Sequence, residues 1–221
     1  MKINFTNLYK LAPEKNKIFK KINHLIKTNQ FIGGEEVIKF EAEFSKFTGS
    51  RYCVSVANGT DALLLSIKAL KLKKGSEAIV PVNTWISTAE AVVEGGLKLI
   101  FCDVDLNDYS MDLNDLRKKI TKNTKLILPV HLYGNPTNMV EIKKIINKKN
   151  IKIVEDCAQA HGSTIKKKHV GTFGDIGTYS FFPGKNLGCF GDGGAIITNN
   201  KKYYEFVLRA RNHGALKKYD H

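Results

Sequence analysis

The stretch that decides the fold reads Tyr52-Cys-Val-Ser-Val-Ala-Asn-Gly-Thr-Asp-Ala-Leu-Leu-Leu-Ser-Ile-Lys-Ala-Leu70. Residues 52–56 form a short apolar run typical of a buried strand, and residues 60–70 repeat apolar side chains at helical spacing. Asn58-Gly59-Thr60 lies between them, so the predicted helix begins directly after the predicted strand. A strand followed at once by a helix is the repeating unit of α/β proteins.

The same unit recurs along the chain. We expect further strands at 78–81, 97–102, 125–130 and 151–155, and further helices at 87–94, 113–120 and 139–147. Alternation at these lengths predicts an α/β layer fold whose sheet is mostly parallel and flanked by helices. In such a sheet the helices begin at the C-terminal edge of the strands, which is where ligands bind.

The alternation stops near residue 176. Residues 176–182 and 195–198 are predicted strands joined by a glycine-rich loop without a helix, and a last helix is expected at about 201–212. Two strands joined in this way form a hairpin, so we expect a mixed sheet.

A helical segment is predicted at residues 1–50, ahead of the α/β core at 51–221. Positions 13–28 and 35–47 each carry apolar side chains at helical spacing. No internal repeat or low-complexity linker divides the chain.

The composition narrows the class of protein. No apolar run approaches the length of a membrane span, and the N-terminus lacks a signal-peptide core. The four cysteines are far apart and form no CxxC pair, which argues against a disulfide framework or a zinc site. We therefore expect a cytoplasmic protein with no membrane partner and no metal.

The net charge of +14 raises the possibility of a nucleic-acid partner. The charge comes from scattered lysines, with only four arginines, and no basic stripe is interleaved with aromatic residues. We expect no nucleic-acid partner. Salt-dependent binding to duplex would be required for that alternative.

Lys185 lies between the apolar pair Phe181-Phe182 and a cluster of glycines. A lysine that turns inward on such a loop loses solvation, so its pKa falls and its neutral amine becomes a nucleophile. Taken alone, a loop lysine is more commonly solvated.

Two further positions suit a phosphate. Gly59 and Thr60 open a helix, where free N–H groups and the helix dipole favour an anion, and Ser180 offers a hydroxyl upstream of Lys185. The alternative for the Asn58-Gly59-Thr60 turn is an ordinary helix cap.

Asp156 ends a predicted buried strand, where a carboxylate is costly unless it pairs with a cation such as a protonated ring nitrogen. The alternative is a cap or turn residue. Gln159 and His161 are close enough in sequence to share the site, although a histidine there is more commonly structural. Trp85, after another strand end, either stacks on a flat ring or packs in the core.

An anion cup, a carboxylate, an aromatic plate and an inward lysine together are the parts of a pyridoxal phosphate site. Five stretches resemble the DegT/StrS family of sugar aminotransferases, which are fold-type-I pyridoxal phosphate enzymes: Asn58-Gly-Thr-Asp-Ala-Leu63, Val80-Pro-Val-Asn-Thr-Trp85, His131-Leu-Tyr-Gly134, Glu155-Asp-Cys-Ala-Gln-Ala-His-Gly162 and Ser180-Phe-Phe-Pro-Gly-Lys-Asn-Leu-Gly188 with Gly191-Asp-Gly-Gly194. They run through nearly the whole chain.

The resemblance implies a role for each matching residue. Lys185 forms the Schiff base and later shuttles a proton, Asp156 pairs with the pyridine nitrogen, and Gln159 lies by the phenolic oxygen. Trp85 takes the stacking position, and the phosphate is held by Gly59, Thr60 and Ser180. Apart from the resemblance, the closeness of His161 to Asp156 in sequence makes it a candidate substrate contact. Some relatives carry histidine in place of this lysine and perform dehydration, so Lys185 favours transamination.

The resemblance also implies substrates and assembly. The amino group would move from an amino acid, with glutamate expected, to a nucleotide-linked ketosugar, and the site would form in a homodimer. Family members continue well past this length, so residues 1–221 correspond to the cofactor-binding large domain, without the small C-terminal domain. The alternative is an inactive truncated fragment with a binding or regulatory role.

Overall fold

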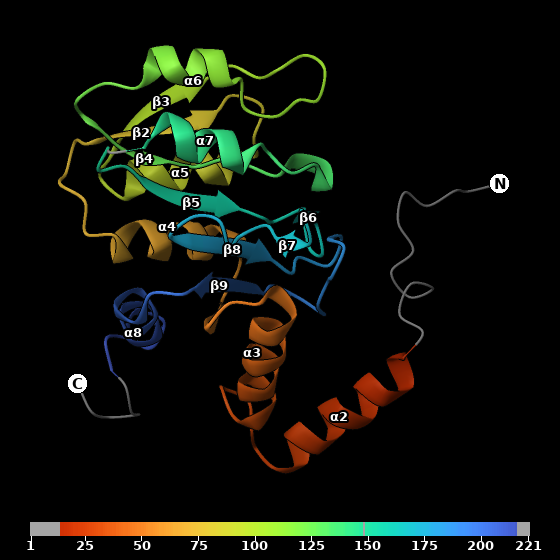
Figure 1. The fold of residues 1–221 in the computed structure, drawn as a ribbon. Coiled ribbons are helices and arrows are strands. Elements are labelled where there is room, and N and C mark those ends of the chain that lie inside the picture. The colour runs from red at the N-terminus through yellow and green to blue at the C-terminus, as the bar shows by residue number, and fades with distance from the viewer. Residues whose placement is uncertain (1–13, 148, 216–221) are drawn as a thin grey trace.

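A seven-stranded sheet in the order β1-β9-β8-β5-β4-β2-β3 forms the centre of the computed structural model, which describes residues 14–147 and 149–215 (Figure 1). The strands are β1 (Tyr52–Val56), β2 (Glu77–Pro81), β3 (Lys98–Cys102), β4 (Thr124–Ile127), β5 (Lys152–Asp156), β8 (Ile176–Ser180) and β9 (Gly194–Thr198). β9 is antiparallel to β1 and β8, while the other neighbouring pairs are parallel. The mixed, mostly parallel sheet expected from the sequence is confirmed.

Helices cover both faces of this sheet. They are α4 (Gly59–Ala69), α5 (Ile86–Glu94), α6 (Leu113–Lys119), α7 (Met139–Ile145) and α8 (Lys201–Ala210). Leu63, Val92 and Val207 bring α4, α5 and α8 into one buried cluster, and Leu116 and Ile142 bring α6 and α7 into another. Strand residues alternate between the two clusters because successive side chains point to opposite faces. The three-layer arrangement follows from this alternation.

The N-terminal helices α2 (Lys15–Lys27) and α3 (Glu35–Thr48) correspond to the helices predicted at 13–28 and 35–47, while positions 1–13 of the predicted helical segment lie outside the described residues. α2 has no buried residue and projects from the body of the molecule (Figure 1). α3 packs against the sheet through Phe44, whose ring meets Tyr179 and Phe181 edge-on. Edge-to-face pairs of this kind are favourable beyond their buried area.

Several element boundaries differ from the sequence expectations. β4 ends at Ile127 rather than at 130, with Pro129, which has no N–H to donate, just beyond. Two further elements were not expected from the sequence: the 3-10 turn η1 (Leu132–Gly134) and a small hairpin formed by β6 (Thr164–Ile165) and β7 (Lys168–His169). The hairpin turn has positive φ at Lys166 and Lys167, 49° and 66°, where glycine or asparagine would be the usual signal.

In the described part of the chain, no helix combines the length and apolar character required to cross a bilayer. Nor do these residues bring three acidic, histidine or cysteine side chains together as a metal site. All four cysteines are free thiols, and three of them are buried.

Candidate active site

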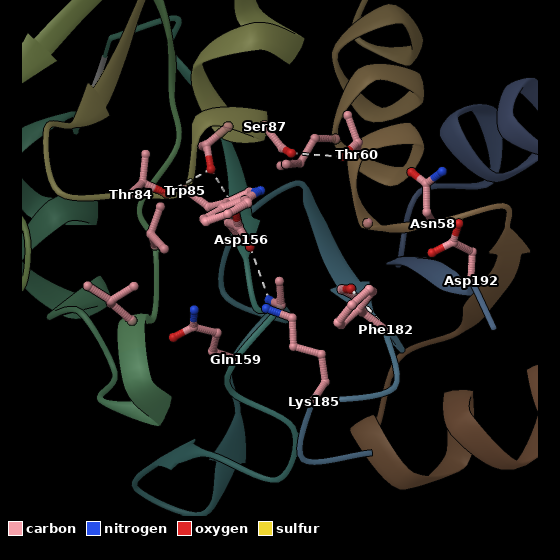
Figure 2. Close-up of a pocket in the computed structure, with 17 residues that line it drawn as sticks. Asn58, Thr60, Thr84, Trp85, Ser87, Asp156, Gln159, Phe182, Lys185 and Asp192 are labelled. Atoms are coloured by element: carbon pink, nitrogen blue, oxygen red, sulfur yellow. Dashed lines mark hydrogen bonds between the residues drawn. The ribbon is translucent and has the colours of Figure 1, made fainter. Parts of the chain in front are cut away.

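A cavity of about 620 Å³ lies at the C-terminal edge of the sheet (Figure 2). Its wall combines the first turns of α4 and α5, the ends of β5 and β8, and the loop after β8. Seven of the predicted residues occur on this wall: Gly59, Thr60, Trp85, Asp156, Gln159, Ser180 and the predicted nucleophile Lys185. The structure therefore gathers residues more than 120 positions apart in sequence into one site.

The first turn of α4 forms the anion cup of the cavity. Asn58 caps the helix, with its Oδ1 accepting the N–H of Asp61 at 2.8 Å. Gly59 lies so close to β8 that a Cβ in its place would come within 2.7 Å of the Ser180 Cβ. Glycine is thus required where the helix start and the Ser180 hydroxyl face the same space. The turn can serve both as a helix cap and as a phosphate site. The cap uses the N–H of Asp61, and Gly59 remains on the cavity wall.

Thr60 and Ser87 supply a pair of hydroxyls beside the cup. Thr60 Oγ1 donates to Ser87 Oγ at 2.9 Å, which joins the starts of α4 and α5 (Figure 2). A hydroxyl has one proton to donate, so in this arrangement the Ser87 proton is left for another acceptor. Ser87 was missed in the sequence analysis. Its signal was present, because a serine in the first turn of a helix at this sheet edge is a phosphate-ligand position.

Lys185 extends from the loop after β8 toward the end of β5, where Asp156 lies (Figure 2). A tight turn sets its direction, in which the Lys185 N–H donates to the carbonyl of Phe182 at 2.8 Å. Gly188 closes the same loop against Pro183, and a side chain there would collide with the Pro183 carbonyl. The Lys185 side chain is half-buried, which lies between the inward-turned lysine and the solvated loop lysine considered from the sequence.

Asp156 ends β5 and is 5% exposed. Its Oδ1 accepts the Ala158 N–H at 3.0 Å and its Oδ2 accepts the Thr88 hydroxyl at 2.9 Å. Burial raises the pKa of Asp156, and these two hydrogen bonds, with the charges of His131 and Lys185, act in the opposite direction. A carboxylate in this balance is suited to a cationic ring nitrogen in the cavity.

Gln159 is oriented by the backbone of the η1 turn. Its Oε1 accepts the Tyr133 N–H at 2.9 Å, so its two amide protons remain for an acceptor in the cavity. Tyr133 has φ of 55°, a left-handed conformation that is unfavourable for a tyrosine. Strain of this kind is common beside functional sites.

Trp85 is 73% exposed and lies on the cavity wall at the start of α5, so it is not a packed core residue. An exposed indole face at a cavity mouth is available for stacking. Phe182, 56% exposed, also lines the wall and was not singled out from the sequence.

His161 is placed outside the cavity wall. Its ring lies 5.5 Å from Tyr179 and 5.4 Å from Phe181, within the aromatic cluster beneath α3. Burial lowers the pKa of His161 to about 4, and neither ring nitrogen has a hydrogen-bond partner among the described residues. His161 does not line the cavity, and its expected contact with a substrate stays a prediction.

These features define an α/β protein of the fold-type-I aminotransferase class. The chain belongs to the DegT/DnrJ/EryC1/StrS aminotransferase family, whose model matches residues 13–221. It is 42% identical over 210 residues to the UDP-N-acetyl-3-dehydro-alpha-D-glucosamine 3-aminotransferase of Acidithiobacillus ferrooxidans, covering 95% of this chain and 57% of that protein.

Two solved structures show the same architecture. S. venezuelae DesV, solved in complex with a ketimine intermediate, matches with a TM-score of 0.94 at 34% identity, covering 99% of this chain and 59% of that one. The E. coli GDP-4-keto-6-deoxy-D-mannose-3-dehydratase with bound hydrated PLP matches with a TM-score of 0.85 at 39% identity, covering 89% and 52%. The chain thus spans between half and two thirds of the length of these proteins.

Proposed function

We propose that this chain is the cofactor-binding unit of a pyridoxal-phosphate-dependent aminotransferase that acts on a nucleotide-linked ketosugar. The observation that carries the proposal is the convergence of Lys185, the buried Asp156 carboxylate and the Gly59–Ser180 cup on one cavity. Each group alone has an ordinary structural explanation. Together on one wall, the anion cup, the Asp156 carboxylate and the Lys185 amine match the phosphate, the ring nitrogen and the aldehyde of pyridoxal phosphate.

The residues present fit the cofactor. The Gly59–Ser180 approach leaves room for a phosphate only because position 59 has no side chain. Asp156 retains acceptor capacity on both oxygens for a ring N–H, since each oxygen accepts a single hydrogen bond from the chain. The free amide protons of Gln159 suit a phenolic oxygen, and Trp85 suits a ring face.

When bound, the cofactor supplies an electron-accepting ring that stabilises negative charge on the substrate carbon. The chain supplies the rest. Asp156 accepts the ring N–H and holds it protonated, while the α4 start, Ser180 and the Thr60–Ser87 hydroxyls hold the phosphate. Lys185 would anchor the cofactor through Nζ, and its amine, once released, would move a proton between the substrate carbon and the cofactor.

The amino donor proposed is an amino acid, with glutamate preferred, and the acceptor is a ketosugar joined to a nucleoside diphosphate. Lysine at position 185 favours amino transfer over dehydration, and the net charge of +14 favours anionic substrates. The name of the A. ferrooxidans relative supports a nucleotide sugar as acceptor.

We further propose a cytoplasmic homodimer. The free thiols fit a reducing compartment. Val82 and Ile86, close in sequence to Trp85 of the cavity wall, leave apolar surface exposed at 53% and 59%, which suits contact with a second copy. Residues 1–221 would then be the large domain, with 1–50 as its helical segment and 51–221 as its α/β core, and a small domain would complete the whole protein.

The test combines a spectrum with an activity. Purified chain mixed with pyridoxal phosphate should develop a visible absorption band that Lys185→Ala lacks, and borohydride should fix the cofactor's mass to the wild-type chain but not to the variant. Amino transfer from glutamate to nucleotide-linked ketosugars then measures function. An identical spectrum in the variant would refute the site, and a bound cofactor without amino transfer would favour the inactive-fragment alternative.

A further inference from the structure

Thr88 is in direct contact with the carboxylate that the proposed site depends on. It lies in the first turn of α5, and it is fully buried, with an exposed fraction of 0%. Its Oγ1 donates to Asp156 Oδ2 at 2.9 Å, and the other carboxylate oxygen accepts the Ala158 N–H at 3.0 Å. Thr88 is thus the one side-chain hydroxyl among the described contacts that fixes the rotation of this carboxylate.

A second threonine orients the first. Thr84 Oγ1 and Thr88 Oγ1 are 2.8 Å apart, which is within hydrogen-bond distance. An ionised carboxylate only accepts, so the Thr88 proton points to Asp156 and the Thr84 proton points to Thr88. Protonation of Asp156 at Oδ2 would reverse both hydroxyls. The Thr88 hydroxyl favours the ionised form because it donates a hydrogen bond to Asp156 Oδ2.

The other charged groups near Asp156 are engaged with other partners. His131, which precedes the η1 turn, has its Nε2 3.1 Å from Glu155 Oε2, so any charge on its ring is matched by a second buried carboxylate. Lys185, on the loop after β8, is the amine that the proposed function engages with the cofactor. The Thr88 hydroxyl, by contrast, would not react with the cofactor.

We propose that Thr88, supported by Thr84, is a positioning residue that keeps Asp156 ionised and aimed into the cavity. The part of this inference that concerns the cofactor rests on the proposed function, while the part that concerns the carboxylate does not. Burial raises the pKa of Asp156 and the Thr88 hydrogen bond lowers it, which agrees with the geometry.

The experiment compares Thr88→Val, which keeps the shape and removes the hydroxyl, with Thr88→Ser, which keeps the hydroxyl. The matched control is Thr198→Val, because Thr198 is also buried, at 5% exposed, and its hydroxyl donates to the Asp175 carbonyl at 2.7 Å, far from the cavity. For each chain, carbon-13 NMR follows the titration of the Asp156 carboxyl without cofactor, assigned by its absence in Asp156→Asn. Fluorescence titration then gives the dissociation constant for pyridoxal phosphate across the same pH range.

We expect the Asp156 titration to move to higher pH in Thr88→Val and to stay near the wild-type position in Thr88→Ser and Thr198→Val. The pyridoxal phosphate dissociation constant at pH 7 should rise about tenfold in Thr88→Val, as for loss of a hydrogen bond to a charged group. As the solution is acidified, the affinity of Thr88→Val for pyridoxal phosphate should begin to fall at a higher pH than that of the wild type. An unmoved Asp156 titration in Thr88→Val, or a serine variant that behaves like valine, would overturn the inference. If the wild-type chain binds no pyridoxal phosphate, the proposed function fails, and the carboxyl titration still decides the role of Thr88.

Discussion

Replacement of Asp156 by asparagine should separate stability from cofactor binding. The substitution keeps the shape of the side chain and removes its charge. Asparagine Oδ1 can still accept the Ala158 N–H, and its amide can donate to Thr88, whose proton then turns to Thr84. No buried polar group loses its partner, so the charge is the main change.

The sign follows from burial. Burial raises the pKa of Asp156 above its ordinary value of 3.8 in the folded chain. A carboxyl that binds its proton more tightly when folded stabilises the fold fully below its ordinary pKa, and this contribution is lost as the pH rises through the raised value. Without cofactor at pH 7, Asp156→Asn should therefore raise the free energy of unfolding, by an amount on the order of 1–3 kcal/mol for relief of a buried charge that keeps its hydrogen bonds. A chain of this length gains about 2–4 °C in Tm for each kcal/mol.

Cofactor binding should change in the opposite direction. Loss of the charged acceptor for the ring N–H costs about 1.5–3 kcal/mol, which weakens pyridoxal phosphate by about 10- to 100-fold. Thermal unfolding at several pH values, with and without pyridoxal phosphate, measures both effects in one series. Asp175→Asn is the control, because Asp175 is paired with Lys152 at 3.0 Å and its loss should lower the Tm. The reasoning is refuted if Asp156→Asn melts below the wild type at pH 7 without cofactor, or if it binds pyridoxal phosphate equally well.

Three other substitutions test the remaining parts of the site. Gly59→Ala should weaken the binding of pyridoxal phosphate and also cost about 1–3 kcal/mol in stability, because its Cβ would meet Ser180 at 2.7 Å. Fluorescence titration and denaturant unfolding measure the two effects, and an unchanged affinity would contradict the phosphate-binding role of this turn. Trp85→Ala should weaken the cofactor by about 3- to 10-fold through loss of stacking, with Trp85→Phe closer to wild type; equal affinities for the three chains would contradict the stacking role. His161→Leu should leave amino transfer unchanged. It should also abolish the loss of stability between pH 6.5 and about 4 that results from the lowered pKa of this buried histidine; a large fall in kcat would instead place His161 in the reaction.

Most of the fold could be predicted from local sequence. β1 was predicted at its observed bounds, because its apolar run ends at a polar, glycine-containing turn. The hairpin of β8 and β9 and the mixed sheet also followed from the absence of a helix between 182 and 195. The β6–β7 hairpin was missed because lysines occupy the two turn positions with positive φ, so the turn carries no compositional signal.

The candidate site was predicted in part. Gly59, Asp156 and Lys185 each stood at a strand end or loop where the chemistry was readable from the residue type. Thr88 and Ser87 were missed because threonine and serine at a helix start have an ordinary role as polar first-turn residues. His161 was grouped with the site by its closeness in sequence, but the structure turns its ring under β8 and into the cluster beneath α3.

The sequence by itself determined the class of fold and the kinds of chemical group available, because periodicity and residue type act locally. It also placed the helix starts at the sheet edge, since right-handed parallel crossovers allow little else. Only the tertiary structure decided which groups share the cavity and how they are oriented. Thr88 meets Asp156, although they are 68 positions apart, because α5 packs across the edge where β5 ends. That contact depends on strand order and on the packing of side chains, neither of which a local pattern encodes.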